Sequence, residues 1–421
     1  MKKVNYLIDK KAMFLFTIFL ILQPILDMFL GIFANYSIVS SLISIFKILF
    51  MFFCIYYVVV IKKKNYIYFL ILFIYSVIFL ITNFLLKDNG NIFTELKLLS
   101  KNLFLPVSLS FIINLFKEKK FDIKKIYIIE YIYIILLFIP NILNLGYNSY
   151  SYSKLGSVGF FYSANAIGAI ISILMPLVVG NFIIKNNKKH LFIFLLIYLY
   201  ILVTIGTKAP LLCAMIVLLY YFIIFGINLI EKKQKNKILI IIFIVFISAI
   251  CMIKIIPLTP FYKNLIIHLN FLNINSLKDF LSFKNIDHFV FSSRLSFLKE
   301  SFKIFSNSSL IQKLFGVGYV ANKSLLKTSE MDYFVTLIHQ GIFGFIVLYY
   351  LYFKSMFIIY KEYFKKLHLN IKNIEKTSIL IGLYISVLCA FLAGHVLETP
   401  SVCIFVTTLI GIMFEKLNIE V

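Results

Sequence analysis

Long runs of apolar residues, separated by short clusters of lysine, set the pattern of this chain. Each run holds roughly twenty residues, which is the length that an α-helix needs to cross about 30 Å of hydrocarbon. Twelve runs fit this description, and they cover residues 12–33, 40–61, 66–86, 98–116, 126–145, 160–184, 190–206, 210–230, 238–256, 333–352, 377–394 and 401–414. The pattern therefore predicts an all-α, polytopic integral membrane protein with about twelve transmembrane helices.

One long segment, residues 257–331, lacks a membrane-length apolar run and divides the chain. We expect nine membrane helices in residues 1–256, then this loop segment, then three membrane helices in residues 332–421. Within the loop, residues 292–307 carry apolar side chains at helical spacing, which predicts an amphipathic helix on the membrane surface or over a cavity. Its apolar face consists of Leu295, Leu298, Phe302 and Phe305.

The lysines predict which side of the membrane each loop occupies. Seven alternate segments, including both termini, hold 26 of the 42 basic residues, whereas the five short connections on the other side hold five. Lysine is retained in short cytoplasmic loops, and long loops cross the membrane regardless of charge. We therefore expect both termini in the cytoplasm and residues 257–331 outside it. The net charge of +24 follows from this topology and does not indicate nucleic-acid binding.

Composition supports this interpretation. Hydrophobic residues make up 61% of the chain, and its mean hydropathy of +0.95 is far above that of soluble domains. The first apolar run is too long for a signal peptide, so we expect it to be retained as a helix. All five cysteines lie inside apolar runs without metal-ligand spacing, which indicates small core residues rather than disulfides or a metal site.

Arg294 is the only arginine in the chain, beside 41 lysines. Arginine presents a planar fork of donors that matches phosphate and carboxylate groups, and lysine cannot copy it. Arg294 falls in the first turn of the predicted 292–307 helix, where a cation is unfavourable for the helix dipole, and no acid lies three or four residues away. It is therefore either a chance survivor in a lysine-rich composition or a phosphate-binding residue beside the membrane.

Short motifs surround Arg294 in a fixed order. Downstream of Ser293-Arg294-Leu295 come Leu314-Phe315-Gly316-Val317-Gly318-Tyr319, Glu330-Met331-Asp332-Tyr333 and Gly341-Ile342-Phe343-Gly344. Upstream lie Gln23-Pro24-Ile25-Leu26-Asp27, the helix start Tyr162-Ser163-Ala164-Asn165, and the outer turn Gly206-Thr207-Lys208.

This set of motifs resembles the O-antigen polymerase and O-antigen ligase superfamily of Wzy-type membrane proteins. In that family an arginine-bearing segment and a Gly-x-Gly turn precede a helix that starts with a polar dyad and carries Gly-x-x-Gly eleven residues later. Glu330 and Gly341 are eleven residues apart. Two departures stand out: the ligase pattern has histidine at the dyad where this chain has Glu330-Met331, and the family's Gly-Ser-Arg turn has Lys208 in place of arginine.

The resemblance implies metal-independent glycosyl transfer at the outer face of a bacterial cytoplasmic membrane, without a soluble cofactor. Donor and acceptor would be glycans linked to polyprenyl pyrophosphate in the bilayer, with a flippase and a chain-length regulator as candidate partners. Arg294 and Lys208 would bind the leaving pyrophosphate. Glu330, or else Asp332, would act as the general base on the acceptor hydroxyl. The expected lining of the site is Gly316, Gly318, Tyr319, His395 and Glu398.

Structural roles are the alternative for most of these residues. Glu330 and Asp332 suit the N-terminal end of a helix, where acids favour the dipole. Lys208 suits an interfacial position from which its amine reaches water. Gly341 and Gly344 suit close packing of helices.

Three classes of function fit the predicted topology. The first is a polymerase of lipid-linked repeat units, and its near neighbour is a ligase that moves a finished glycan to another acceptor. The second is a flippase or other transporter, which would place cations within the membrane helices of both halves. Here the membrane interior is nearly free of cations apart from Lys47, for which Asp27 is a candidate partner. The third, a structural or sensor protein, gives no reason for the Arg294–Glu330 layout.

Overall fold

The computed structural model describes residues 2–34, 36–85, 91–149, 155–231, 256–272, 281–321, 324–325, 330–366 and 373–419. In these ranges ten helices are long and apolar enough to span a membrane, which confirms the predicted all-α polytopic fold. They are α1 (Lys2–Ile32), α2 (Ser37–Ile55) continued by the π-helix η1 (Tyr56–Ile61), α3 (Tyr66–Leu85), α4 (Ile92–Glu118), α5 (Lys124–Ile142), α6 (Ala164–Ile184), α7 (Lys188–Ile205), α15 (Asp332–Lys365), α17 (Ile374–Leu392) and α18 (Pro400–Leu417).

Two of the twelve predicted spans are not among these ten. Residues 210–230 lie in α8 (Lys208–Glu231), of which the apolar part Lys208–Ile224 is shorter. The predicted span 238–256 falls outside the described residues except for its last residue, which begins the short helix η2 (Ile256–Leu258). The count of twelve therefore stays a prediction.

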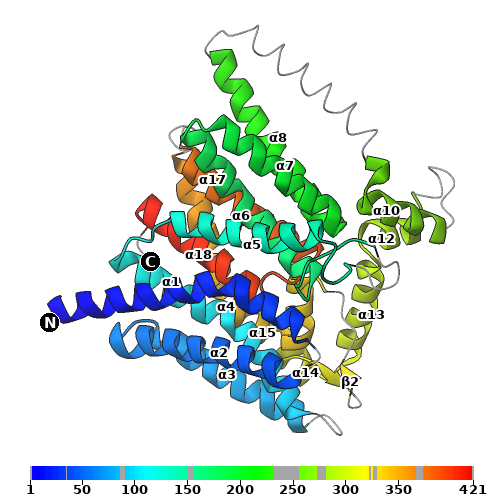
Figure 1. Ribbon diagram of the computed structural model, residues 1–421. Coiled ribbons are helices and arrows are strands. Elements are labelled where there is room, and N and C mark those ends of the chain that lie inside the picture. The colour runs from blue at the N-terminus through cyan, green and yellow to red at the C-terminus, as the bar shows by residue number, and fades with distance from the viewer. Residues whose placement is uncertain are drawn as a thin grey trace.

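Helices α4 and α18 form the centre of the bundle and lie side by side in Figure 1. In each helix, about four fifths of the most apolar stretch of residues is buried inside the protein (78% and 83%). Because protein rather than lipid surrounds them, they tolerate polar residues whose hydroxyls bond within the helix. Ser108 donates to the Phe104 carbonyl at 2.6 Å, and Thr408 donates to the Ile404 carbonyl at 2.6 Å.

The described parts of the chain between residue 256 and α15 fold as short elements gathered at one end of the bundle, whereas α1 begins and α18 ends toward the other end (Figure 1). These elements are α10 (Pro260–Phe271), α12 (Phe283–Val290), α13 (Arg294–Asn307), α14 (Leu310–Phe315) and the antiparallel pair β1 (Val320–Ala321) and β2 (Ser324–Leu325). Helix α13 matches the predicted amphipathic helix, and its Phe302 ring packs edge-on against Phe334 of α15 at 6.3 Å.

A glycine contact fastens this segment to the membrane helices. Helix α15 is broken at Gly341, which has φ 73° and ψ 178°. A Cβ on Gly341 would lie 2.3 Å from the Gly316 nitrogen, and a Cβ on Gly316 would lie 2.1 Å from the His339 carbonyl oxygen. Gly318 adds a hydrogen bond from its N–H to the same carbonyl at 3.0 Å. The turn and the kink therefore require glycine for close packing.

Candidate active site

Asp287, a residue of α12, positions the start of α13. Its carboxylate is fully buried and accepts the N–H groups of Leu295 and Ser296, each at 2.9 Å, and the Ser296 hydroxyl at 2.5 Å. These bonds satisfy N–H groups that have no partner within the helix and put a negative charge at its positive end. The carboxylate thereby offsets the unfavourable position of Arg294 as the first residue of α13.

The Arg294 guanidinium lies against Glu330, which directly precedes α15. Its Nη2 is 3.0 Å from Glu330 Oε2, and its Nη1 lies 3.5 Å from the Phe291 carbonyl oxygen. Its Nε is buried and has no hydrogen-bond partner within the part of the chain that the structure describes. The Arg294 side chain is 13% exposed and that of Glu330 is 45% exposed. Arg294 therefore keeps donors that a further anion can use.

His395 completes a row of three charged or titratable groups. It lies on the loop between α17 and α18, and its Nε2 is 3.6 Å from Glu330 Oε2. The neighbouring His395 imidazole, together with the Arg294 guanidinium, lowers the pKa of Glu330 to about 2 despite partial burial. The two loops touch closely here, because a Cβ on Gly394 would lie 1.3 Å from the Glu330 carbonyl oxygen.

Asp332 holds the His395 loop in place. Its Oδ1 accepts the His395 N–H at 2.8 Å, and its Oδ2 accepts the Val396 and Leu397 N–H groups at 2.9 and 2.7 Å. The side chain is almost completely buried. All three bonds are charge-assisted, so Asp332 ties the α17–α18 loop to the start of α15.

Glu398 belongs to the same α17–α18 loop, next to the start of α18. Its Oε1 accepts the Thr336 hydroxyl at 2.6 Å. Burial, together with the negative charge of Asp332, raises the pKa of Glu398 to about 8. Near neutral pH its carboxyl group is therefore largely protonated, unlike that of Glu330.

Lys208, the first residue of α8, reaches the segment that carries Arg294. Its Nζ donates to the Phe289 carbonyl oxygen and lies 4.2 Å from the centre of the Phe289 ring. The Arg294 charge is close enough to act on the Lys208 amine. The turn before it ends α7 at Gly206, which has φ 73°. The structure thus brings Lys208, Arg294, Glu330 and His395 to the same end of the bundle.

The other predicted lining residues fix the loop rather than contact the Arg294–Glu330 pair. Glu95, near the start of α4, accepts the Tyr319 N–H with both carboxylate oxygens, at 2.8 and 2.9 Å. The buried Tyr319 ring stacks on His339, and its hydroxyl accepts from the Asn102 and Gln340 amides. Gly316 and Gly318 form the docking turn described above.

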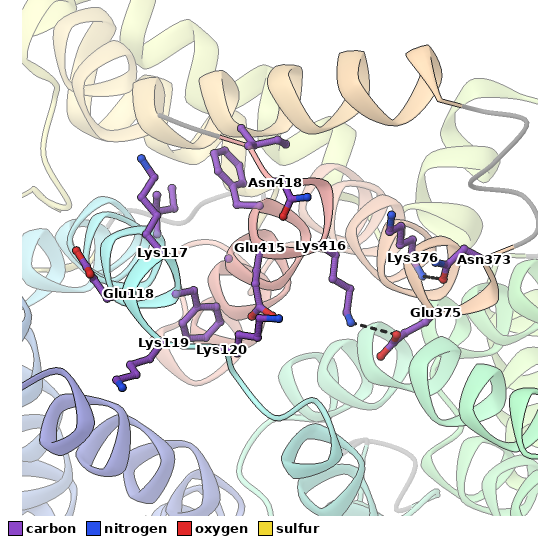
Figure 2. A pocket seen from close by; sticks show the side chains of 15 residues that line it. Lys117, Glu118, Lys119, Lys120, Asn373, Glu375, Lys376, Glu415, Lys416 and Asn418 are labelled. Carbon is purple, nitrogen blue, oxygen red and sulfur yellow. Dashed lines mark hydrogen bonds and ion pairs between the residues drawn. The ribbon is translucent and has the colours of Figure 1, made fainter. Parts of the chain in front are cut away.

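A cavity with mixed charges is remote from this site. It has a volume of about 940 Å³ and lies at the opposite ends of the same helices, where α4 and α18 end and α17 begins. Figure 2 shows that positively charged lysine and negatively charged glutamate side chains line it, and Lys416 pairs with Glu375 at 3.0 Å. Since its charges are mixed and it contains none of the motif residues, we assign it no catalytic role.

A smaller cavity of about 560 Å³ borders the site, because His395 forms part of its wall. It also contains Lys47, whose amine lies 3.5 Å from Asp27 Oδ1. The predicted Asp27–Lys47 pair is thus confirmed. No group of three or more histidine, cysteine or acidic residues suited to a metal ion is found among the described residues.

A family model described as O-antigen ligase like membrane protein matches residues 9–285 and 280–420. The chain belongs to this family. The match confirms the superfamily resemblance that the motifs around Arg294 predicted, and it assigns the chain to a class of membrane glycosyltransferase-like enzymes. A search of curated proteins finds no significant match.

Two acidic residues of this O-antigen ligase like protein were missed from the sequence. Asp287 binds backbone N–H groups at the start of α13, eight residues away. Glu95 binds those of the turn at Tyr319, 224 residues away. Such carboxylates have no local sequence pattern because most of their partners are backbone N–H groups. No signal in the sequence sets them apart from the other acids of the chain.

Proposed function

We propose that this protein transfers glycan chains at the outer face of the cytoplasmic membrane, from a polyprenyl-pyrophosphate donor to a sugar hydroxyl of a second lipid-linked unit. The observation that carries the proposal is the row Arg294–Glu330–His395, assembled from three separate segments of the chain at one end of the bundle. The family match supports glycan transfer, and polymerisation of repeat units is our choice within it.

Arg294 would bind the pyrophosphate that leaves. Its unpaired Nε and the nearby Lys208 amine supply donors and positive charge beyond those that Glu330 uses. Charge on the leaving group grows as the anomeric bond breaks, so fixed cations stabilise the transition state more than the ground state. By analogy with the loss of an oxyanion donor, removing this contact should raise the barrier by about 3–4 kcal/mol.

His395 is the better candidate for the general base. A carboxylate with a pKa of about 2 is a weak base at neutral pH, which argues against Glu330 in this role. Glu330 would instead accept a hydrogen bond from His395 Nε2 and leave Nδ1 to take the proton of the acceptor hydroxyl. The acceptor oxygen forms the new glycosidic bond, the anomeric carbon–phosphate oxygen bond breaks, and pyrophosphate keeps the electron pair.

Asp332 and Glu398 would support this arrangement without touching the substrate. Asp332 uses both oxygens to hold the His395 loop, so it has little capacity left for proton transfer. We propose that the protein works in a bacterial cytoplasmic membrane with both termini in the cytoplasm, as the lysine distribution predicts. A flippase that supplies the substrate and a chain-length regulator stay predicted partners.

The experiment uses purified protein in liposomes with a lipid-linked oligosaccharide and measures released polyprenyl pyrophosphate and product length. His395→Gln should lower the rate by about 100-fold or more. Glu330→Gln should also lower it, because the imidazole loses the carboxylate that orients it. Lys299→Gln, an exposed position on α13, is the control. Full activity of His395→Gln with unchanged pH dependence would overturn the assignment of the base.

A further inference from the structure

The 560 Å³ cavity that His395 borders has a second cationic cluster. Lys97 and Lys101 lie one helical turn apart near the start of α4, and Lys47 reaches the same space from α2. Like charges four residues apart repel and destabilise a helix. Among the ion pairs of the described residues, only Lys47 of these three takes part, through Asp27. Glu398 is close enough to act electrostatically on the Lys101 amine, but its raised pKa leaves it largely protonated near neutral pH, so it compensates little of this charge.

The start of α6 adds to the positive potential of the cavity. Tyr162 and Ser163, which directly precede this 21-residue helix, line the cavity together with Ala166 of its first turn. The Ser163 hydroxyl accepts the Ala166 N–H at 3.3 Å, and the remaining N–H groups at the helix start favour an anion. The start of the Tyr-Ser-Ala-Asn motif, which the Arg294 site does not use, thus lines the 560 Å³ cavity.

Apolar side chains extend the cavity toward the membrane interior. Lys47 lies ten residues into α2, or roughly 15 Å of helix from its start. Apolar residues also line the cavity, and Ile48, Met51 and Phe104 lie further along α2 and α4 than the lysines. A cluster of cations beside apolar walls matches an amphiphile with an anionic head and a hydrocarbon chain. A free sugar or a soluble nucleotide would leave the apolar walls unused.

We propose that this cavity binds the diphosphate headgroup and first isoprene units of a second polyprenyl-linked substrate. The inference rests on the proposed function, because it supplies the second lipid-linked molecule that polymerisation requires. The Arg294–Lys208 pair then holds one diphosphate and the Lys47–Lys97–Lys101 cluster holds the other. His395, which contacts Glu330 and also borders the cavity, lies where both substrates meet.

The test measures the stoichiometry of farnesyl diphosphate binding to the full chain in nanodiscs. Wild-type protein should bind two equivalents. Lys97→Gln/Lys101→Gln should retain one, with the other weakened by about tenfold for each lysine removed. Arg294→Gln should retain the cavity equivalent instead. Inorganic pyrophosphate should bind the cavity at least tenfold more weakly than farnesyl diphosphate, because it leaves the apolar walls empty.

The control is Lys299→Gln/Lys303→Gln, which removes two exposed lysines at the same four-residue spacing on α13 and should leave both equivalents intact. Two equivalents in the Lys97/Lys101 variant would overturn the cavity proposal. A single wild-type equivalent that only Arg294→Gln removes would overturn it too, and would leave the proposed function untouched. A single equivalent lost only with Lys97 and Lys101 would instead overturn the role of Arg294. Equal affinity for pyrophosphate would overturn the lipid part.

Discussion

Replacing Asp332 by asparagine separates a structural carboxylate from a catalytic one. The carboxylate accepts three backbone N–H groups, one on Oδ1 and two on Oδ2. Asparagine has a single acceptor oxygen. In its better orientation this oxygen keeps the Val396 and Leu397 bonds, and its amide nitrogen then faces the His395 N–H as a second donor.

The size of the effect follows from this geometry. One buried N–H loses its partner, which costs about 1–3 kcal/mol, and the two bonds that remain lose their charge assistance. Burying a neutral amide costs less than burying a charge, which offsets part of this loss of stability. We therefore expect Asp332→Asn to lower the free energy of unfolding by about 2–3 kcal/mol and to loosen the loop that carries His395.

Thermal unfolding in detergent and hydrogen exchange at residues 395–397 measure this effect. Asp332→Asn should unfold at a lower temperature and exchange faster at these three amides, with a partial loss of glycan transfer. Glu300→Gln, an exposed acid on α13, is the matched control. Unchanged unfolding and exchange with complete loss of transfer would refute the reasoning, because that result identifies Asp332 as the group that moves the proton.

Three further predictions follow from the same contacts. Gly341→Ala should destabilise the fold by about 2 kcal/mol, because its Cβ would overlap the Gly316 nitrogen; an unchanged melting temperature contradicts this. Asp287→Ala should cost about 1–2 kcal/mol and speed hydrogen exchange at the start of α13, and unaltered exchange argues against the cap. Stability should fall from pH 5 to 8, because folding raises the pKa of Glu398 to about 8 and its ionisation is unfavourable in the fold. Between pH 5 and 8 this fall in stability should be about 3 kcal/mol smaller in Glu398→Gln than in the wild type, and equal falls would refute it.

The sequence predicted the membrane helices because each must present about twenty apolar residues to lipid. The apolar signal is weakest in α4 and α18, and the structure shows why. These helices are surrounded by protein, so residues such as Ser108 and Thr408 satisfy their hydroxyls within the helix and weaken the apolar signal. Helix ends also differed: α1 begins at Lys2 and α15 continues to Lys365, since polar residues extend a helix beyond the membrane.

The candidate site was predicted in part. The solitary Arg294 and the dyad at Glu330 pointed to the pair that the structure places 3.0 Å apart. The groups that surround this pair could not be predicted from the sequence. The pKa of Glu330 depends on His395, which is 65 residues away, and the placement of Arg294 depends on Asp287, whose partners are backbone atoms. Such contacts form only once the loops have folded together.

The most direct test of the central claim is glycan chain length in cells that carry Arg294→Lys, with protein abundance checked alongside. Lysine keeps the charge but loses the planar fork of donors. The account predicts short, single-repeat glycan at normal protein levels, because the departing pyrophosphate is no longer held. Polymer of normal length would contradict the role of Arg294. Glycan of normal length that is missing from its final acceptor would contradict polymerisation and identify the protein as a ligase.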